Sequence, residues 1–247
     1  PVEIRLALFD GKNEFVKRRD DAFVRQLTVL TLAGEPDKAV GYLKDKVFSY
    51  REGASTVREI IIDAQLILGI QYYSDKKYQK ALDHFLLAQV PDEEAGSARS
   101  GKREIQVNYY IGLAYEALQN KKEAKTYFTL AIKVETSEEK GDNTGFMSYY
   151  KGLSYLKLQK KAEADTIFEL LVANGDNQLN PDSSNQTDYF QIFGQQQDKN
   201  SRTPMSYTIR GLGFKGLGEK NKAQEDLKKA VDLSVGNLWA MLVLEGL

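Results

Sequence analysis

The sequence predicts an all-α protein, an array of about five helix hairpins joined by long connectors. Apolar residues recur at the spacing of an amphipathic helix, and no long segment has the alternation of apolar and polar residues that is typical of a strand. One pattern of glycine, aromatic and alanine residues also occurs four times along the 247 residues. Such internal repetition is typical of a helical repeat array.

Four glycines define the repeat, because the residues at +3, +12 and +16 after each of them are of the same types. The +3 residue is aromatic, the +12 residue is alanine, and the +16 residue is phenylalanine or leucine. A glycine inside a helix costs about 1 kcal/mol relative to alanine. We therefore expect the glycine to let two helices approach closely, with the +3 and +16 side chains filling the space beside that contact. The four sets are Gly69, Tyr72, Ala81 and Phe85; Gly112, Tyr115, Ala124 and Phe128; Gly152, Tyr155, Ala164 and Phe168; and Gly211, Phe214, Ala223 and Leu227.

Each repeat is predicted to contain two helices separated by a short basic turn. A degenerate first repeat within residues 1–50 has Leu27, Leu30, Ala39 and Leu43 at the same offsets but no glycine. Residues 1–247 are therefore predicted to form a single α-solenoid domain. Because the chain starts at Pro1 without a methionine, we expect it to be a fragment of a longer protein. The predicted turns lie at residues 75–77, 120–122, 160–161 and 218–221.

The glycine pattern resembles the tetratricopeptide repeat (TPR), a 34-residue helix hairpin that stacks into a right-handed superhelix. This resemblance implies a scaffold that binds proteins. The sequence departs from the family in two ways. The glycines are 43, 40 and 59 residues apart, which lengthens the connectors, and Lys151 and Arg210 replace the apolar residue expected before the glycine.

A narrower resemblance covers nearly the whole chain. The order of its loop motifs is similar to the C-terminal repeat region of an uncharacterised bacterial family, in which a mutarotase-like β-sandwich domain precedes the repeats. This resemblance implies a further N-terminal domain and no catalytic activity in the repeats. The motifs are RRDDAF (18–23), YREGASTV (50–57), GSARSGK (96–102), TDYFQIF (187–193) and YTIRGLGFKGLG (207–218).

Two glycine motifs have the spacing of nucleotide-binding loops. Gly211, Gly213 and Gly216 have the G-x-G-x-x-G spacing, and residues 96–102 spell G-x-x-x-x-G-K. A functional motif of either kind follows a strand and opens a helix, where free N–H groups meet the phosphates. Here the first motif lies inside a predicted helix, and Arg103 stands where the second needs a serine or threonine. We interpret the first as helix packing and the second as a connector, and predict no nucleotide or other cofactor.

The composition argues against several other functions. With 34 basic and 35 acidic residues the net charge is −1, so nucleic acid is not favoured as a partner. The chain has no cysteine and one histidine, His84, which we expect at the surface or edge of its helix. These residues do not provide a catalytic site or a zinc site, so we predict that the chain is not an enzyme. No apolar run is long enough to insert into a membrane, and the sequence leaves cytoplasm and periplasm open.

The predicted function is a non-enzymatic scaffold for protein–protein interaction. First helices of stacked hairpins line a concave surface, where we expect an apolar groove for a peptide, a partner helix or the missing N-terminal domain. One alternative is that these side chains are buried against one another or against a connector. Another is that the chain is an accessory domain of a carbohydrate-active or carbohydrate-binding bacterial protein. The residues predicted to line the groove are Leu66, Ile70, Tyr73, Tyr109, Leu113, Glu116, Phe146, Tyr149, Leu153, Leu156, Thr208, Leu212 and Lys215.

The longest connector, residues 174–204, is polar except for one apolar cluster, Tyr189, Phe190, Ile192 and Phe193. Large apolar residues do not gather in a polar loop without a use. We expect this cluster to form a short helix that docks at the mouth of the groove near Tyr149 and Leu153.

Overall fold

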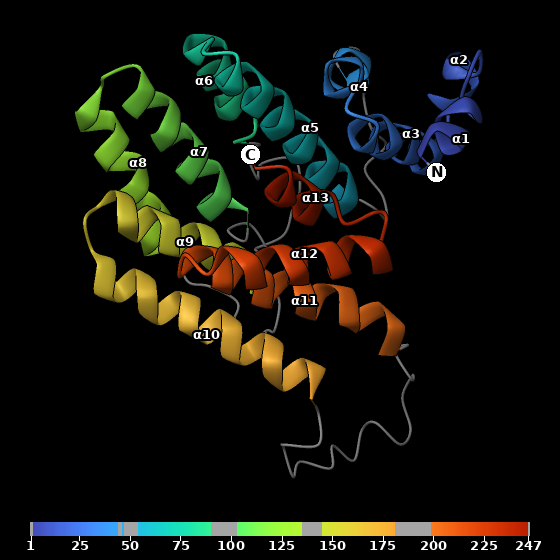
Figure 1. Ribbon diagram of the computed structural model, residues 1–247. Helices are drawn as coiled ribbons and strands as arrows, with labels where there is room; N and C mark the ends of the chain where they lie inside the picture. The colour runs from blue at the N-terminus through green and yellow to red at the C-terminus, as the bar shows by residue number, and fades with distance from the viewer. Residues whose placement is uncertain are drawn as a thin grey trace. The chain divides into compact units, whose positions relative to one another are not determined.

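The structure is a computed structural model that describes residues 2–43, 46, 54–89, 103–134, 145–180 and 199–246. Figure 1 shows that this part of the chain is a succession of helices, which confirms the all-α prediction. It contains no strand within those ranges. The helices are α1 (Val2–Ala7), α2 (Asn13–Val16), α3 (Asp20–Leu32), α4 (Pro36–Leu43), α5 (Ala54–Ser74), α6 (Tyr78–Leu87), α7 (Glu104–Ala117), α8 (Lys121–Lys133), α9 (Phe146–Lys157), α10 (Lys161–Leu179), α11 (Lys199–Gly216), α12 (Lys220–Leu233) and α13 (Leu238–Leu244).

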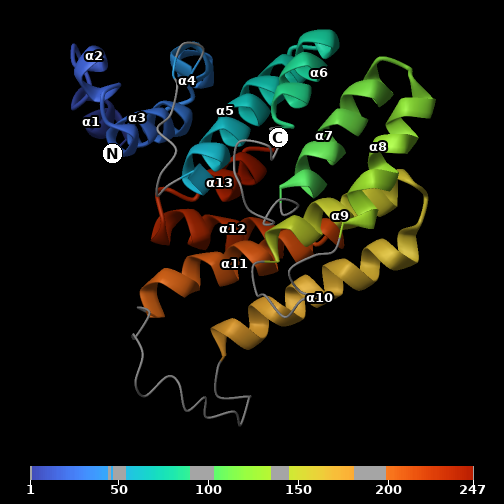
Figure 2. The same cartoon turned by 180° about the vertical axis from the view of Figure 1, so that it is seen from behind.

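The chain divides into two compact units, residues 1–124 (unit 1) and residues 125–247 (unit 2). In unit 1, α3, α4, α5, α6 and α7 pack against one another in chain order. In unit 2, α10 packs against both α9 and α11, which also contact each other, and α12 packs against α11 and α13 (Figures 1 and 2). Whether residues 1–247 act as one domain stays a prediction.

The core at the start of unit 1 contains the degenerate first repeat. Leu27 and Leu30 of α3 and Ala39 of α4 are buried in one cluster with Phe23 and with apolar residues of α5. Leu6 and Phe9 pack against the same cluster from the N-terminal segment. Burial of each large apolar side chain contributes about 1.5 to 3 kcal/mol. The first repeat is thus stabilised by its apolar positions although it lacks the signature glycine.

The repeat glycines lie where two helices of a hairpin meet. A Cβ atom added to Gly69 would overlap the ring of Phe85, and one added to Gly152 would overlap the ring of Phe168. The predicted close approach is present, but its geometry differs from the expectation in one respect. The +16 side chain lies directly on the glycine and does not fill a space beside it. The glycine is required because the ring occupies the volume of a side chain at that position.

The turns between first and second helices share one backbone conformation. The residue at +7 has a positive φ in every repeat, including the first repeat counted from Leu27, and the N–H of the +8 residue donates to the carbonyl of the +3 residue over 2.8 to 2.9 Å. This is the Schellman arrangement that ends many helices. The turns start up to two residues before their predicted positions. The +7 residues are Gly34 (φ 76°), Lys76 (62°), Gln119 (64°), Gln159 (61°) and Gly218 (81°).

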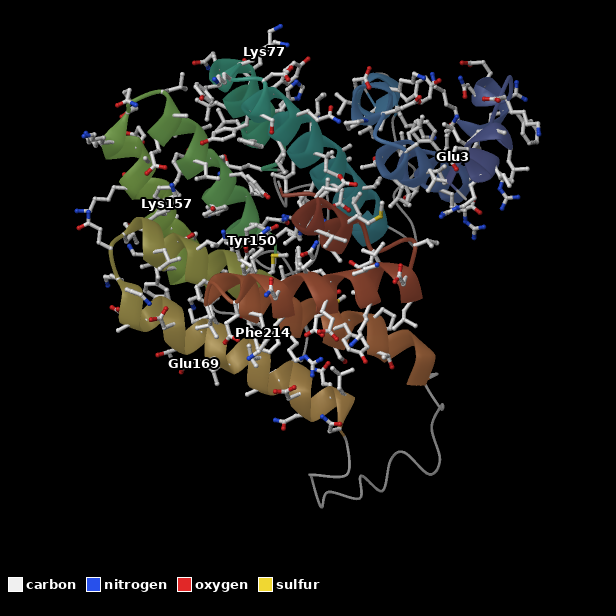
Figure 3. The ribbon with its side chains drawn as sticks, viewed as in Figure 1. Glu3, Lys77, Tyr150, Lys157, Glu169 and Phe214 are labelled. Carbon is white, nitrogen blue, oxygen red and sulfur yellow. The ribbon has the colours of Figure 1, made fainter. Side chains whose placement is uncertain are left out.

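Lysines of the basic turns and of the first turn of the following helix lie over the +3 aromatic rings. Lys77 and Lys80 are 5.8 and 5.5 Å from the ring centroid of Tyr72, and Lys222 is 5.0 Å from that of Phe214. Figure 3 shows Lys77 projecting from the turn between α5 and α6. Cation–π contacts of this kind contribute about 0.5 to 1 kcal/mol at exposed sites. The basic character of the turns therefore has a structural role in covering the aromatic residues.

The connector predicted over residues 174–204 is shorter than expected, because α10 continues to Leu179 and α11 begins at Lys199. Gly175 explains the extension of α10. A Cβ atom at this glycine would lie 2.5 Å from Cβ of Arg210 and 3.0 Å from the Ser206 carbonyl, so the glycine lets α10 and α11 pack closely. The apolar cluster Tyr189–Phe193 and the motif at residues 96–102 lie outside the described residues.

Candidate protein-interaction surface

The three glycines with dinucleotide-binding spacing all serve the packing of α11. A Cβ atom on Gly211 would lie 2.9 Å from Cγ of Leu227 in α12. On the other side, a Cβ atom on Gly213 would lie 2.7 Å from the Phe168 carbonyl oxygen in α10, and one on Gly216 would overlap the Phe168 ring. The motif therefore lies within a helix that contacts both neighbouring helices closely.

In unit 1, the residues predicted to line the groove differ in exposure along their helices. Leu66, Ile70 and Tyr109 are buried, with 0, 5 and 9% of their surface exposed. Tyr73 and Leu113 are half-buried, as is Glu116 of α7. The half-buried residues are those near the C-terminal ends of α5 and α7, so this is where a partner could make contact in unit 1.

Tyr73 is held in place by an aromatic neighbour. Its ring centroid is 5.2 Å from that of Tyr78, with the planes tilted by 59°. Partial burial raises the pKa of the Tyr73 hydroxyl, and the charges of Tyr78 and Glu116 raise it further. Tyr73 is thus a neutral hydrogen-bonding group on a largely apolar surface at neutral pH.

In unit 2, the predicted groove residues are again partly buried. Tyr149, Thr208 and Leu212 are buried, whereas Leu156 is exposed. Burial, followed by the charge of Tyr150, raises the pKa of Tyr149 well above its usual value. Phe146, Leu153 and Lys215 are half-buried. Two of these half-buried residues, Phe146 and Lys215, contact the C-terminal helix α13.

The C-terminal helix α13 contacts three residues of the predicted groove. The side-chain amide of Asn237 donates to Oγ1 of Thr208 over 2.7 Å, and Nζ of Lys215 donates to the carbonyl of Val243 over 2.7 Å. The ring centroids of Trp239 and Phe146 are 6.0 Å apart. Burial lowers the pKa of the Lys215 ammonium group. A segment of the chain itself thus contacts this part of the predicted groove.

Helix α13 was not predicted from the sequence, because it carries no complete copy of the repeat pattern. Its signal is local: Asn237 precedes the run LWAMLVL, and its side-chain oxygen accepts a hydrogen bond from the N–H of Ala240. An asparagine before an apolar run is a typical helix start. That combination could have indicated the helix.

Buried and half-buried ion pairs tie neighbouring helices together. Arg210, the residue before the repeat glycine of α11, forms two hydrogen bonds of 2.6 and 2.8 Å with Asp226 of α12 and one of 2.7 Å with Asp176 of α10. These bonds, with Asp226 contributing most, raise the pKa of Arg210 above its usual value. Lys151, at the equivalent position in α9, donates to the Val134 carbonyl over 3.1 Å. The two charged residues that depart from the TPR pattern therefore have partners in adjacent segments.

A similar ion-pair cluster joins α7 to α5 in unit 1. Arg103 contacts Glu59 and Asp63, each over 2.6 Å, at the N-terminal end of α7. The nearby His84 is half-buried, and its Nδ1 lies 2.7 Å from Oε1 of Gln65, while its ring stacks on Tyr72. Among the described residues no group of histidine and acidic side chains has the arrangement of a metal site. These contacts have a structural role, since they join neighbouring helices.

These helices form a helical repeat protein in which the residues predicted to line the groove are partly buried. Two segments match family models of the tetratricopeptide repeat, residues 105–137 and residues 147–174. They cover the repeats of Gly112 and Gly152. The chain therefore contains tetratricopeptide repeats, as the glycine pattern predicted. The curated protein sequences contain no significant match to this chain.

Several solved structures resemble this chain at low identity. YrrB, described as a TPR protein with an unusual peptide-binding site, is 16% identical, with 97% of this chain and 96% of that chain covered and a TM-score of 0.32. MamA from AMB-1 is 15% identical, with coverage of 87% and 98% and a TM-score of 0.33. BtubC (BKLC) from P. vanneervenii is 14% identical, with coverage of 100% and 89% and a TM-score of 0.36.

None of the described helices is both long enough and apolar enough to cross a membrane.

Proposed function

We propose that this chain is a non-enzymatic protein-interaction module that binds a peptide or a partner helix on the inner positions of its first helices. Tetratricopeptide repeats generally mediate protein–protein interaction, and two such repeats are detected here. The observation that carries the proposal is the change from buried to half-buried residues along α5 and α7. Leu66 and Ile70 support the surface from below, and Tyr73 and Leu113 contact the partner.

The contact residues of unit 1 favour a particular kind of segment. Tyr73 and Leu113 provide apolar area, and the tyrosine hydroxyl provides a hydrogen-bonding group. Glu116 adds negative charge close enough to raise the pKa of Tyr73. A segment with an apolar side chain next to a lysine or arginine matches this combination, because aromatic anchors give most of the affinity and charge gives orientation.

A displayed library of random 12-residue peptides, selected on the full chain, tests the proposal. Peptides selected on the wild-type chain should bind the Tyr73→Ala variant at least about ten-fold more weakly, the loss typical of an aromatic anchor. Fluorescence anisotropy with a labelled selected peptide measures the dissociation constant.

Leu87→Ala is the matched control, because Leu87 is an exposed apolar residue on the second helix α6, with 58% of its surface exposed. It should leave the dissociation constant unchanged. If every selected peptide binds wild type and Tyr73→Ala equally well, the surface around Tyr73 is not the binding site. A selection that yields no peptide with saturable binding would also contradict the proposal.

The accessory-domain alternative, the further N-terminal domain and the choice between cytoplasm and periplasm stay predictions. The contacts described above do not bear on them.

A further inference from the structure

We infer that the inner face of unit 2 binds an apolar partner helix, and that α13 is its resident competitor, which must leave before the partner can dock. This inference rests on the proposed function and names the occupant for one part of the predicted groove. It begins from the contacts of α13, because they fall on residues that the repeat pattern assigns to partner binding. Those residues are Phe146, Thr208 and Lys215.

Helix α13 packs mainly against α12, and side chains at its two ends also connect it to α11. Asn237, at the start of α13, contacts Thr208, and Val243, near its end, contacts Lys215. The two contacts are about 10 Å apart along α11 and about 9 Å apart along α13 at 1.5 Å per residue. The two contacts therefore occur in the same order and at matching spacing along both helices. A partner helix of about two turns would fit the same surface.

The contacts at the two ends of α13 are made by its N-cap side chain and by a backbone carbonyl of its last turn. Asn237 caps the N-terminus and donates to Thr208, and Lys215 binds a carbonyl of the last turn. Lysine at a helix C-terminus is favourable because of the unpaired carbonyls and the helix dipole. The donation from Asn237 to Thr208 and the contact of Trp239 with Phe146 depend on specific side chains. The surface thus fits an apolar helix with an Asn or Ser cap, which can donate to Thr208, and an aromatic residue in its first turn.

Helix α13 has the properties of an exchangeable occupant. It is seven residues long, and isolated helices of that length are not stable in water. All seven residues are apolar, yet only Ala240 and Val243 are buried. A helix that is apolar on all sides is normally buried on all sides. The other five residues are half-buried, so part of the apolar surface of α13 stays uncovered in its present position, which limits how strongly it docks.

The experiment uses a fluorescein-labelled peptide of residues 234–246, added to the full chain and followed by anisotropy. The Asn237→Ala change in the chain weakens only the resident helix, because the peptide keeps its own asparagine. A lost cap corresponds to about a five-fold change in equilibrium constant, so the peptide should bind this variant about five-fold more tightly. Lys215→Met removes a contact that the resident helix and the peptide both make, so it should change the apparent affinity much less than Asn237→Ala does, and Lys222→Ala, at the start of α12, should have no effect.

The single tryptophan of the chain, Trp239, gives a second measurement that does not depend on a variant. An unlabelled peptide with Trp239→Phe, added in excess to the wild-type chain, should displace α13. Quenching of Trp239 by acrylamide should then rise and its emission should shift to the red. This measurement also serves if Asn237→Ala fails to fold.

The inference is overturned if the peptide does not bind, if Asn237→Ala binds it no more tightly than wild type, or if Trp239 emission stays constant at saturating peptide. The proposed function is tested separately by Tyr73→Ala in unit 1. Loss of selected-peptide binding in Tyr73→Ala, with no effect of the α13 peptide, would leave the interaction module standing and make α13 a fixed cap.

Discussion

At the residue scale, each repeat glycine forms a pair with its +16 side chain. The +16 side chain occupies the space that a side chain on the glycine would fill. The ring of Phe168 lies against both Gly152 of α9 and Gly216 of α11. It therefore fills two positions on neighbouring first helices. Burial of a phenylalanine contributes about 1.5 to 3 kcal/mol, which exceeds the cost of about 1 kcal/mol for a glycine inside a helix.

We predict that Gly152→Ala destabilises the protein by about 1 to 3 kcal/mol, the usual cost of overpacking a core. The added methyl group would overlap a phenyl ring that is held between two helices and has no space to move. Urea denaturation followed by circular dichroism measures the loss as a lower transition midpoint.

Gly41→Ala in α4 is the control, because a Cβ atom there meets nothing within 4 Å. This change should be neutral or should stabilise the chain by up to about 1 kcal/mol, since alanine has the higher helix propensity. If both glycines tolerate alanine equally, the Gly152 position has no packing role.

At this scale the sequence predicted the glycine pairs because the same residue types recur at fixed offsets. It could not predict the partners of Arg210. Asp176 belonged to a segment interpreted as a connector, and Asp226 is one of several acidic residues on α12. A charged residue at an apolar position signals that a partner exists, but the spacing along the chain does not identify it.

At the element scale, five turns close with the same hydrogen bond although only two of them have glycine at the left-handed position. Lys76 and Gln159 adopt φ values of 62° and 61°, which cost a residue with a side chain about 1 to 2 kcal/mol. Glycine avoids that cost but loses more backbone entropy on folding, by roughly 0.5 to 1 kcal/mol. The difference favours glycine.

Lys76→Gly and Gln159→Gly should each stabilise the protein by about 0.5 kcal/mol. The two sites lie in different units, so the double variant should gain the sum of the single effects. Urea denaturation of the single and double variants gives the free energies of unfolding.

Gly218→Ala tests the same effect in reverse. This glycine has φ 81° and no atom within 4 Å of an added Cβ, so any loss comes from backbone conformation alone. A stable Gly218→Ala variant, together with unchanged Lys76→Gly and Gln159→Gly variants, would contradict the assignment of cost to the left-handed residue.

Helix boundaries were less predictable than the repeat itself. The extension of α10 to Leu179 depends on contacts with α11, such as the hydrogen bond from Ser206 to Gln178 over 2.8 Å. A polar segment with Gly175 and Asn180 has low helix propensity, and tertiary packing overrides it. The half-buried state of α13 likewise depends on residues more than twenty positions away, including Thr208 and Lys215. For the candidate site, the pattern predicted a set of inward-facing residues but not that α13 contacts three of them, Phe146, Thr208 and Lys215.

At the scale of the whole molecule, stability is expected to be local because each helix contacts mainly its neighbours in the chain. Unit 1 and unit 2 are each compact, and each has its own charged cluster. Arg103 joins α7 to α5 in unit 1, and Arg210 joins α10, α11 and α12 in unit 2. A change in one cluster should therefore affect the helices that the cluster joins.

Arg210→Met tests this locality by hydrogen exchange. The change keeps the length of the side chain but leaves the Asp226 carboxylate, which is 4% exposed, without its arginine. Loss of one partner of a buried pair costs about 3 kcal/mol, or roughly a hundred-fold in an opening equilibrium. Amide protection in α10, α11 and α12 should fall by up to about that factor, whereas protection in α3 to α6 should not change. Lys229→Met, which removes an exposed pair with Glu225 on α12, should alter protection by less than about five-fold. An equal fall in protection across both units would mean that the chain unfolds as one cooperative body, and the repeat picture of local stability would then be wrong.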